Sequence, residues 1–458
     1  MEARESEEVA PLVVTASAAP AEDRSLPQAS RRENHARDVH ILSFGFLFVF
    51  SAYSAAQNLE STVNTEDDLG TTSLGILYLS FTFFSLTASS MVKFLGSKNA
   101  LVLGSTGYWL FIASNLKPCW YTMVPASLYL GYAASIIWVG QGTYLTSAAR
   151  SHAKDCHLQE GKVIGNFNGE FWGMFASTQV VGNLVSLALL GGGKDGEGFT
   201  GATLLFSVFL ASMTLGTVLL CFLHKRDDRE EPLSEPSATD DHSSVKSMLR
   251  SVVAPLLDKK MLLLVPLLVY SGLQQAYVWS ELTKHVIAPA FGVSGVGGAM
   301  AIYGASDAVC SFVAGRFTSG LPSITLTVSS GSFLQMLALL WLLLKHGQLS
   351  LPPSLSRLSS GELGYVYPLL IAAVWGVGDG VFNTQLNALL ALLFRRNMEA
   401  AFAQLKVWQS ASTAVVFFLG PHISFQAMSL VMLFSLFLSL LSFLFLALRV
   451  ERVFALRS

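Results

Sequence analysis

The chain has 458 residues, of which 52% are hydrophobic and 13% are charged, and its formal net charge is −2. The charged fraction is about half that of a typical soluble domain, and no basic patch with interleaved aromatic residues is present. The composition therefore predicts an integral membrane protein and excludes a nucleic-acid-binding protein. The 4 cysteines lie far apart and fit no disulfide framework or zinc spacing, so we expect no metal and no cofactor.

The first 38 residues are acidic and rich in Pro, Ala and Ser, which predicts a disordered tail. From residue 39 onward, apolar runs longer than about 18 residues follow one another, each long enough to cross a bilayer core of about 30 Å. Backbone groups in lipid must pair internally, so each run is expected to be a helix. The twelve predicted spans are residues 39–60, 71–92, 99–115, 119–140, 164–190, 202–223, 258–282, 295–315, 322–344, 365–390, 398–419 and 423–448.

The spans divide into two sets of six that open on the same pattern. Tyr-Ser-x-x-Gln begins at Tyr53 in the first set and again at Tyr270 in the second. This repeat predicts an all-α membrane protein with two pseudo-symmetric six-helix bundles, which is the 6+6 plan of the major facilitator superfamily. The expected segments are a cytosolic tail at 1–38, bundles at 39–223 and 258–448, a cytosolic linker at 224–257 and a cytosolic C-terminal tail at 449–458.

Lys and Arg residues are distributed unevenly between the two sides of the predicted membrane. One side carries only Lys117, Lys194, Lys284, Lys345 and Arg357, whereas the other carries every remaining Lys and Arg outside the spans. The rich side is expected to be cytosolic, with both termini inside. The membrane itself stays open between the plasma membrane and the vacuolar membrane, because residues 8–13 only approach an acidic dileucine sorting signal.

Polar residues inside the spans are candidates for a central cavity. In the 6+6 plan the first and fourth helices of each half line that cavity. Polar residues there either recognise a ligand or form hydrogen bonds between helices. Glu60 and Glu281 extend the same stripes but lie near the outer interface, where we expect solvation. The cavity-lining candidates are Tyr53, Gln57, Gln141, Tyr270, Gln274, Gln275, Asp379 and Asn383.

Asp379 is the strongest single candidate for function. With Asn383 and Asn387 it repeats every four residues, which gives one polar stripe on a helix. A charge at mid-bilayer costs about 2.5–3.5 kcal/mol on insertion scales, so Asp379 either carries a proton, binds a cation or pairs with a neighbouring helix. The glycines around it lack the third glycine and the βαβ setting of a nucleotide-binding turn.

Two further positions carry intramembrane charges. Glu170 and Lys406 each precede a Trp by two residues at corresponding places in the two halves. Their opposite signs predict an inter-bundle ion pair that forms and breaks as the halves move, or else a static pair or two separately solvated groups. Asp307 is another intramembrane acid, with Tyr303 and Ser311 as expected local partners.

Several of these segments resemble the uncoordinated-ninety-three family. The resemblance runs from about residue 39 to residue 448, and Val39 to Leu42 and Leu128 to Tyr144 look most like the plant members. It implies a major-facilitator fold and regulation of ion channels, chiefly potassium channels, while other family members are trafficking partners of receptors. The motifs are Trp375-Gly376-x-x-Asp379 through Leu389, Glu399-Ala400-Ala401-Phe402 through Trp408, Tyr270 to Gln275, Ala305 to Ser311, and Ser43 to Gln57.

One loop departs from the transporters of this superfamily. They carry an acidic Gly-x-x-x-Asp-Arg-x-Gly-Arg loop between the second and third helices, whereas residues 93–99 lack the acid. No Gly-x-Ser-x-Gly, Walker or His-Glu-x-x-His motif is present, so we do not expect an enzyme. We expect a channel regulator that acts by helix–helix association. The alternatives are a secondary transporter that couples a proton or cation to a small solute, and a trafficking partner of another membrane protein.

Overall fold

The computed structural model describes residues 28–63, 69–190, 198–226, 258–346 and 363–455. Within these ranges the regular structure is entirely helical. The first half contains α1 (Gln28–Val63), α2 (Leu69–Leu95), α3 (Ser97–Ser114), α4 (Trp120–Cys156), α5 (Glu160–Leu190) and α6 (Gly198–Cys221). The second half contains α8 (Lys259–Tyr277), its π-helical continuation η3 (Val278–Ile287), α9 (Ala288–Phe317), α10 (Leu321–His346), α12 (Leu363–Leu393), α13 (Met398–Leu419), the 3₁₀ turn η4 (Gly420–His422) and α14 (Phe425–Ala455).

Every predicted span falls on one of these helices, with 258–282 shared between α8 and η3. Among the described residues, 9 helices are long and apolar enough to cross a membrane by length and composition alone. The helices α3, α5 and α13 are not among these 9. In α13, Lys406 lowers the mean hydropathy, and its side chain faces the interior of the bundle rather than lipid.

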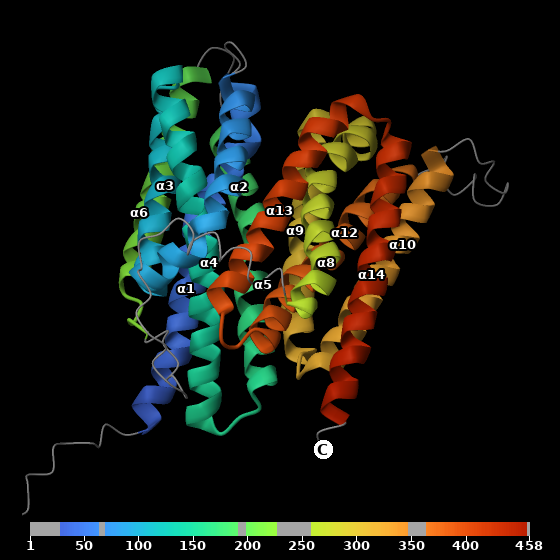
Figure 1. The fold of residues 1–458 in the computed structure, drawn as a ribbon. Coiled ribbons are helices and arrows are strands. Elements are labelled where there is room, and N and C mark those ends of the chain that lie inside the picture. The colour runs from blue at the N-terminus through green and yellow to red at the C-terminus, as the bar shows by residue number, and fades with distance from the viewer. Residues whose placement is uncertain (1–27, 64–68, 191–197, 227–257, 347–362, 456–458) are drawn as a thin grey trace, which may run out of the picture.

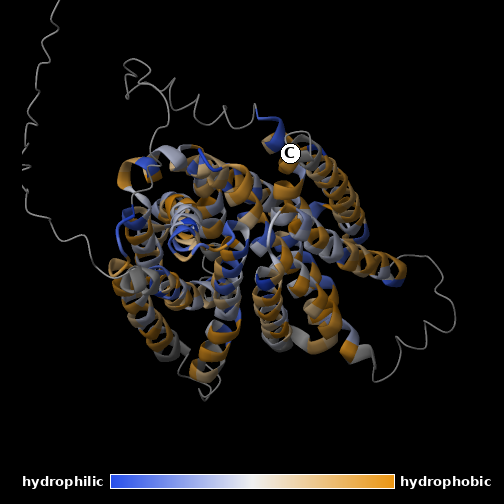
Figure 2. Ribbon diagram, turned by 90° about the horizontal axis from the view of Figure 1, so that it is seen from below, coloured by the Kyte–Doolittle hydropathy of each residue, from blue (hydrophilic) through white to orange (hydrophobic). Residues whose placement is uncertain are grey.

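The helices form two groups that lie side by side (Figure 1). Helices α1–α6 pack with one another in the first group and α8–α14 in the second; the two groups meet where α5 packs on α9 and where α2 packs on α13. Seen along the bundle, hydrophobic residues dominate the outer helices, while hydrophilic residues gather near the line where the groups meet (Figure 2). Large apolar side chains such as Phe83 and Phe434 are 64% and 68% exposed, which suits lipid contact.

The contact between α5 and α9 depends on small residues. Gly161, Gly165, Gly169 and Gly173 recur every fourth residue along α5. The last three face α9 and its C-cap, and Gly161 faces the residues just after α9. A Cβ added to Gly169 would lie 2.7 Å from the Cα of Gly315, which is too close for any side chain. Small residues at this spacing let two helix backbones approach in a membrane, where apolar burial does not drive association. The glycine stripe is therefore what brings the two halves together on this side.

The N-terminal boundary differs from the sequence expectation. We expected disorder through residue 38, but α1 begins at Gln28, so residues 28–38 are helical. The reason is Asp38, which is 1% exposed and accepts hydrogen bonds from Arg226 at 2.8 Å and from the hydroxyl of Tyr144 at 3.1 Å. His224 contacts the same carboxylate at 2.8 Å. This cluster anchors the start of α1 to α4 and to the segment after α6, inside the expected linker. At the other terminus, α14 continues to Ala455, beyond the predicted end at 448.

The two halves are also joined by polar contacts at the end where α1 begins and α14 ends, which we call the lower end (Figure 1). Arg150 of α4 donates to the carbonyl oxygens of Ala391 at 2.7 Å and of Arg395 at 3.3 Å. Glu160 accepts from Arg150 at 3.2 Å and from Arg395 at 2.5 Å. Lys93, in the last turn of α2 and at the start of the segment that lacks the superfamily acid, donates to Asn397 at 2.9 Å. Hydrogen bonds of Arg150, Glu160 and Lys93 thus join the halves at the end where the segment after α2 lacks the superfamily acid.

Candidate ligand cavity between the halves

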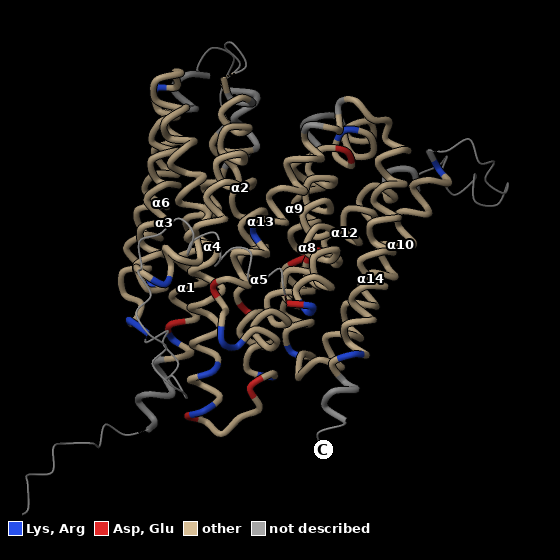
Figure 3. Tube along the Cα trace, in the orientation of Figure 1, with Lys and Arg blue, Asp and Glu red and all other residues tan. Residues whose placement is uncertain are grey.

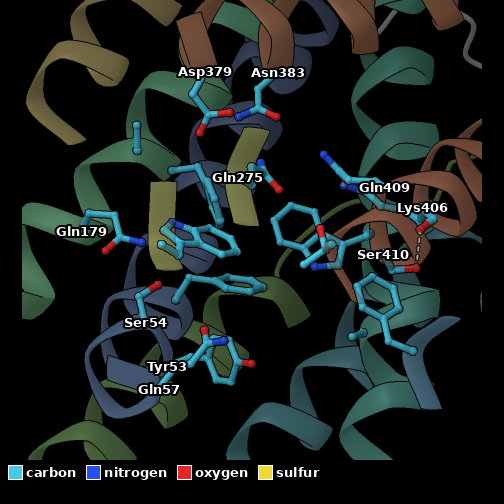
Figure 4. Close-up of a pocket in the computed structure, with 18 of the residues that line it drawn as sticks. Tyr53, Ser54, Gln57, Gln179, Gln275, Asp379, Asn383, Lys406, Gln409 and Ser410 are labelled. Atoms are coloured by element: carbon cyan, nitrogen blue, oxygen red, sulfur yellow. Dashed lines mark hydrogen bonds between the residues drawn. The ribbon is translucent and has the colours of Figure 1, made fainter. Parts of the chain in front are cut away.

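A cavity of about 140 Å³ lies between the halves, with walls from α1, α2, α3, α4 and α5 on one side and α8, η3, α9, α12 and α13 on the other. Figure 4 shows the labelled polar side chains that converge on it. Of the sequence candidates, five line this cavity: Tyr53, Gln57, Gln275, Asp379 and Asn383. Tyr270, Gln274 and Gln141 do not line it. The predicted inter-bundle residue Lys406 and the predicted local acid Asp307 do.

Asp379 sits at the end of a chain of buried hydrogen bonds. The amide of Gln274 donates to Asp379 Oδ1 at 2.8 Å, and the hydroxyl of Tyr303 donates to Oδ2 at 2.5 Å. Behind Gln274, the amide of Gln335 donates to Gln274 Oε1 at 2.7 Å and the hydroxyl of Tyr270 donates to Gln335 Oε1 at 2.7 Å. Each donor in the chain points toward the carboxylate, so the arrangement stabilises an anion. Tyr270 and Gln274 therefore act on the cavity through Asp379.

Asp307 lies on α9 beside Asp379 and has fewer partners. The hydroxyl of Ser311 donates to Asp307 Oδ1 at 3.0 Å, as the spacing on the helix predicted. Tyr303 does not fill its expected role, because its hydroxyl is directed at Asp379. The two acids come together because α9 and α12 approach closely. A Cβ added to Gly380 would lie 2.7 Å from the carbonyl oxygen of Asp307, so no larger residue fits there.

The predicted ion pair between Glu170 and Lys406 is not formed in this structure. Glu170 contacts His40 of α1 instead. The ammonium of Lys406 donates to Gln409 Oε1 at 2.9 Å and lies 4.6 Å from the ring centroid of Trp138. An aromatic face and an amide oxygen thus hold the cation in place of a carboxylate. Glu170 thus contacts α1 of its own half, whereas Lys406 faces Trp138 of α4 in the other half, and periodicity alone does not reveal these partners.

The remaining candidates from the sequence are buried or contact other side chains of the protein. Gln141 is 1% exposed and packed inside the first half. Gln57 lines the cavity and also donates to the hydroxyl of Tyr78 at 2.8 Å. Gln57 on α1 therefore forms a hydrogen bond to α2, which is the second of the two roles considered for such residues. Glu281 is 4% exposed and 3.4 Å from His285, which makes the expectation of a solvated acid wrong. The side chain of Glu60 lies outside the described residues.

Sequence reasoning missed a part of the cavity wall. Gln179, Gln409 and Ser410 line it, as Figure 4 shows. The available signal was helical spacing: Gln409 follows Lys406 by three residues and so shares its face of α13. The aromatic wall was also missed. The rings of Trp138 and Trp172 stack with centroids 5.9 Å apart and an interplanar angle of 6°.

The described part of the chain contains no group of three or more His, Cys, Asp and Glu side chains arranged to hold a metal ion. Two His and a Cys lie close together in sequence at the end of α4, where Cys156 Sγ lies 3.8 Å from His152 Nε2. His157 ends α4 with a positive φ of 52°. The cavity is therefore defined by two carboxylates, one ammonium, amides and aromatic rings.

Comparison with known proteins identifies the family. Residues 61–444 match the family model described as ion channel regulatory protein UNC-93. The chain is 61% identical to "UNC93-like protein 3" of Arabidopsis thaliana over 435 residues, which cover 94% of this chain and 89% of that protein. It is 30% identical to the "Putative potassium channel regulatory protein unc-93" of Caenorhabditis elegans over 443 residues, covering 88% of this chain and 60% of that one. The greater likeness to a plant member agrees with the sequence resemblance.

The fold is shared with solved transporter structures. The crystal structure of FucP, a major facilitator superfamily transporter in the outward conformation, superposes with a TM-score of 0.59. Its sequence is 11% identical, and the superposition covers 90% of this chain and 99% of FucP. Identity this low shows the fold alone. The helices, the duplicated halves and the family match together show that this chain belongs to the UNC-93 family and has the major-facilitator fold.

Proposed function

We propose that this protein regulates an ion channel, and through it potassium homeostasis, by helix–helix association in the membrane. The family match over residues 61–444 carries the proposal, together with the relative that is named as a potassium channel regulator. An apolar face lies between α10 and α14, lined by Met336, Leu340, Leu430, Leu433, Phe434 and Phe437. Faces of this kind can meet lipid or another transmembrane helix.

The lower end is proposed to face the cytosol. Lys and Arg side chains gather there, whereas few are drawn at the opposite end (Figure 3). Positive residues are enriched in cytoplasmic loops, so this distribution supports cytosolic termini and a cytosolic middle linker between the six-helix bundles. The protein would then present its tail and linker to cytosolic regulators, in either the plasma membrane or the vacuolar membrane.

Co-expression with potassium channels tests the regulatory proposal. Channel subunits that co-purify with the full-length protein would be expressed with and without it, and whole-cell current, single-channel conductance and surface abundance would be measured. A regulator changes the gating or current of channels already in the membrane. A change confined to surface abundance would assign a trafficking role instead. If no potassium channel co-purifies and no current changes, the proposal is wrong.

Transport is the second candidate function, because a cavity between the halves contains a buried carboxylate held by directed donors. The test is uptake of a potassium analogue into liposomes that contain only the purified protein, under potassium and proton gradients. Flux that is lost in Asp379→Asn would identify a transporter that uses this cavity. The absence of flux under every gradient would leave the regulator as the remaining function of the two.

A further inference from the structure

Three ionisable side chains meet in the cavity wall, and their charges do not balance. Asp307, Asp379 and Lys406 are 6%, 5% and 7% exposed. Lys406 is the lining residue that carries a positive charge. If all three were ionised, the wall would hold a net negative charge inside the membrane. An uncompensated charge there is costly, so one positive charge must be supplied.

Among the described residues that line the cavity, no Lys or Arg besides Lys406 faces the two acids. On α5, Glu170 contacts His40, and Gln179 is neutral. In η3, Glu281 contacts His285. The other titratable groups near the acids are Tyr303 and Cys310 on α9. The missing charge must therefore come from a proton or from a bound cation.

The partners of the two acids decide where a proton would sit. Asp379 accepts from Gln274 and Tyr303, with Gln275 and Asn383 as further donors beside it. Asp307 accepts from Ser311 alone among the hydrogen bonds of the described residues. Hydrogen bonds to a carboxylate favour its charged form. Asp379 is thus the better-stabilised anion, and the acid with one donor is the better place for a proton.

The chemistry of these partners favours a proton over a metal ion. A bound metal cation requires oxygen atoms directed at it. The groups that face Asp379 instead direct N–H and O–H donors at its oxygens. These donors would have to rotate away before a metal ion could share the carboxylate. A proton requires no such change.

We propose that Asp307 holds an exchangeable proton, with Asp379 as a fixed anion and Lys406 as its counter-cation. In this state the cavity wall is neutral. Release of the proton leaves two adjacent carboxylates and one ammonium, which favours entry of a cation or a movement of the halves. The assignment goes beyond the regulatory proposal, and it requires neither a channel partner nor measurable transport.

Infrared spectroscopy of the full-length protein in lipid nanodiscs tests the assignment. The carboxylic-acid C=O band at neutral pH is compared between wild type and variants. We expect wild type to show a band that Asp307→Asn removes. Lys406→Met removes the Lys found among the described lining residues, so a second acid should take up a proton and the band should grow about twofold by charge balance. The matched control Glu281→Gln alters a buried acid outside the cavity and should leave the Asp307 band in place.

Several outcomes would overturn the proposal. A band that persists in Asp307→Asn and disappears in Asp379→Asn would place the proton on the other acid. A spectrum that changes in neither Asp307→Asn nor Asp379→Asn would leave both acids ionised. If Asp307→Asn does not fold, wild type labelled with carboxyl-¹³C aspartate supplies the test, because an aspartic-acid band must shift on labelling. A band without that shift would contradict the proposal, whether or not the protein regulates a channel.

Discussion

At the scale of single residues, the hydrogen bond from Tyr303 to Asp379 is the shortest contact in the polar network and spans α9 and α12. Hydrogen bonds to charged groups contribute about 1.5–3 kcal/mol, and a buried carboxylate oxygen left without its donor is costly. The network therefore has two effects at once. It holds Asp379 in one orientation at the cavity wall, and it ties two helices of the second half together.

Tyr303→Phe is expected to lower the free energy of unfolding by about 1.5–3 kcal/mol, because it removes the hydroxyl donor and keeps the ring. Denaturant unfolding in nanodiscs measures the loss. Tyr121→Phe is the matched control, since Tyr121 is 92% exposed, and it should change stability by less than about 0.5 kcal/mol. Equal losses in the two variants would show that the buried bond contributes nothing.

At the same scale, Asp38 holds the start of α1. Asp38→Asn removes the charge that faces Arg226, whose side chain is 7% exposed. Breaking a buried pair costs about 3–5 kcal/mol, because the remaining charge stays buried. Thermal unfolding of the purified variant should show this loss. Asp258→Asn serves as control, because Asp258 caps α8 through Lys260 and Asn caps a helix equally well.

At the scale of helices, the halves depend on how closely α5 and α9 approach. The glycines of α5 and Gly315 of α9 leave no room for a side chain between the two backbones. The contact is therefore set by the absence of side chains, and its strength comes from packing and weak polar contacts across the crossing. If one half moves against the other, α5 would have to slide or tilt against α9 along this glycine-lined contact.

Gly169→Ala is expected to lower stability by about 1–3 kcal/mol, because the new methyl group overlaps Gly315 and forces the helices apart. Gly75→Ala is the matched control, since nothing lies within 4 Å of a Cβ at Gly75, and helix propensity should raise stability by about 0.5–1 kcal/mol. A loss of stability in Gly169→Ala together with a gain in Gly75→Ala would confirm that the close approach of α5 and α9 stabilises the protein. A stable Gly169→Ala protein would contradict it.

At the scale of the whole molecule, the two halves are joined at the lower end by Arg150, Glu160 and Lys93 and meet around the cavity farther along the bundle. The segment after α2 lacks the acid that transporters of this superfamily carry there. The structure adds that a lysine of the same region reaches Asn397 and lies 3.9 Å from Glu399. The loss of one loop motif therefore does not leave this end of the halves unconnected.

Arg150→Gln should loosen the lower end, because it removes the guanidinium that joins Glu160 to the carbonyl oxygens of the second half. The measurement is the distance between spin labels at Lys98→Cys and Arg396→Cys in a protein without native cysteines. We expect longer and broader distances in Arg150→Gln and unchanged distances in Lys154→Gln, an exposed charge at the same end. Unchanged distances in both would show that other contacts close this end.

Much of the fold could be predicted, and the reason is local. Every membrane-spanning segment must be apolar over the thickness of a bilayer, and its backbone groups must pair within the same helix, so hydropathy alone located the spans. The repeated pattern that begins at Tyr53 and at Tyr270 indicated two halves. The site was predicted in part. Asp379 and Asn383 were found because a charge and an amide four residues apart stand out in an apolar helix.

The partners of those residues were decided by tertiary structure. Glu170 meets His40, and Lys406 meets Gln409 and Trp138, because the rotation and tilt of each helix set which face it turns inward. Asp307 joins the cavity because Gly380 lets α12 approach α9. By itself, then, the sequence determined the class of protein, its spans and the polar stripes within them. Packing alone decided which stripes meet, since a partner on another helix leaves no mark in local spacing.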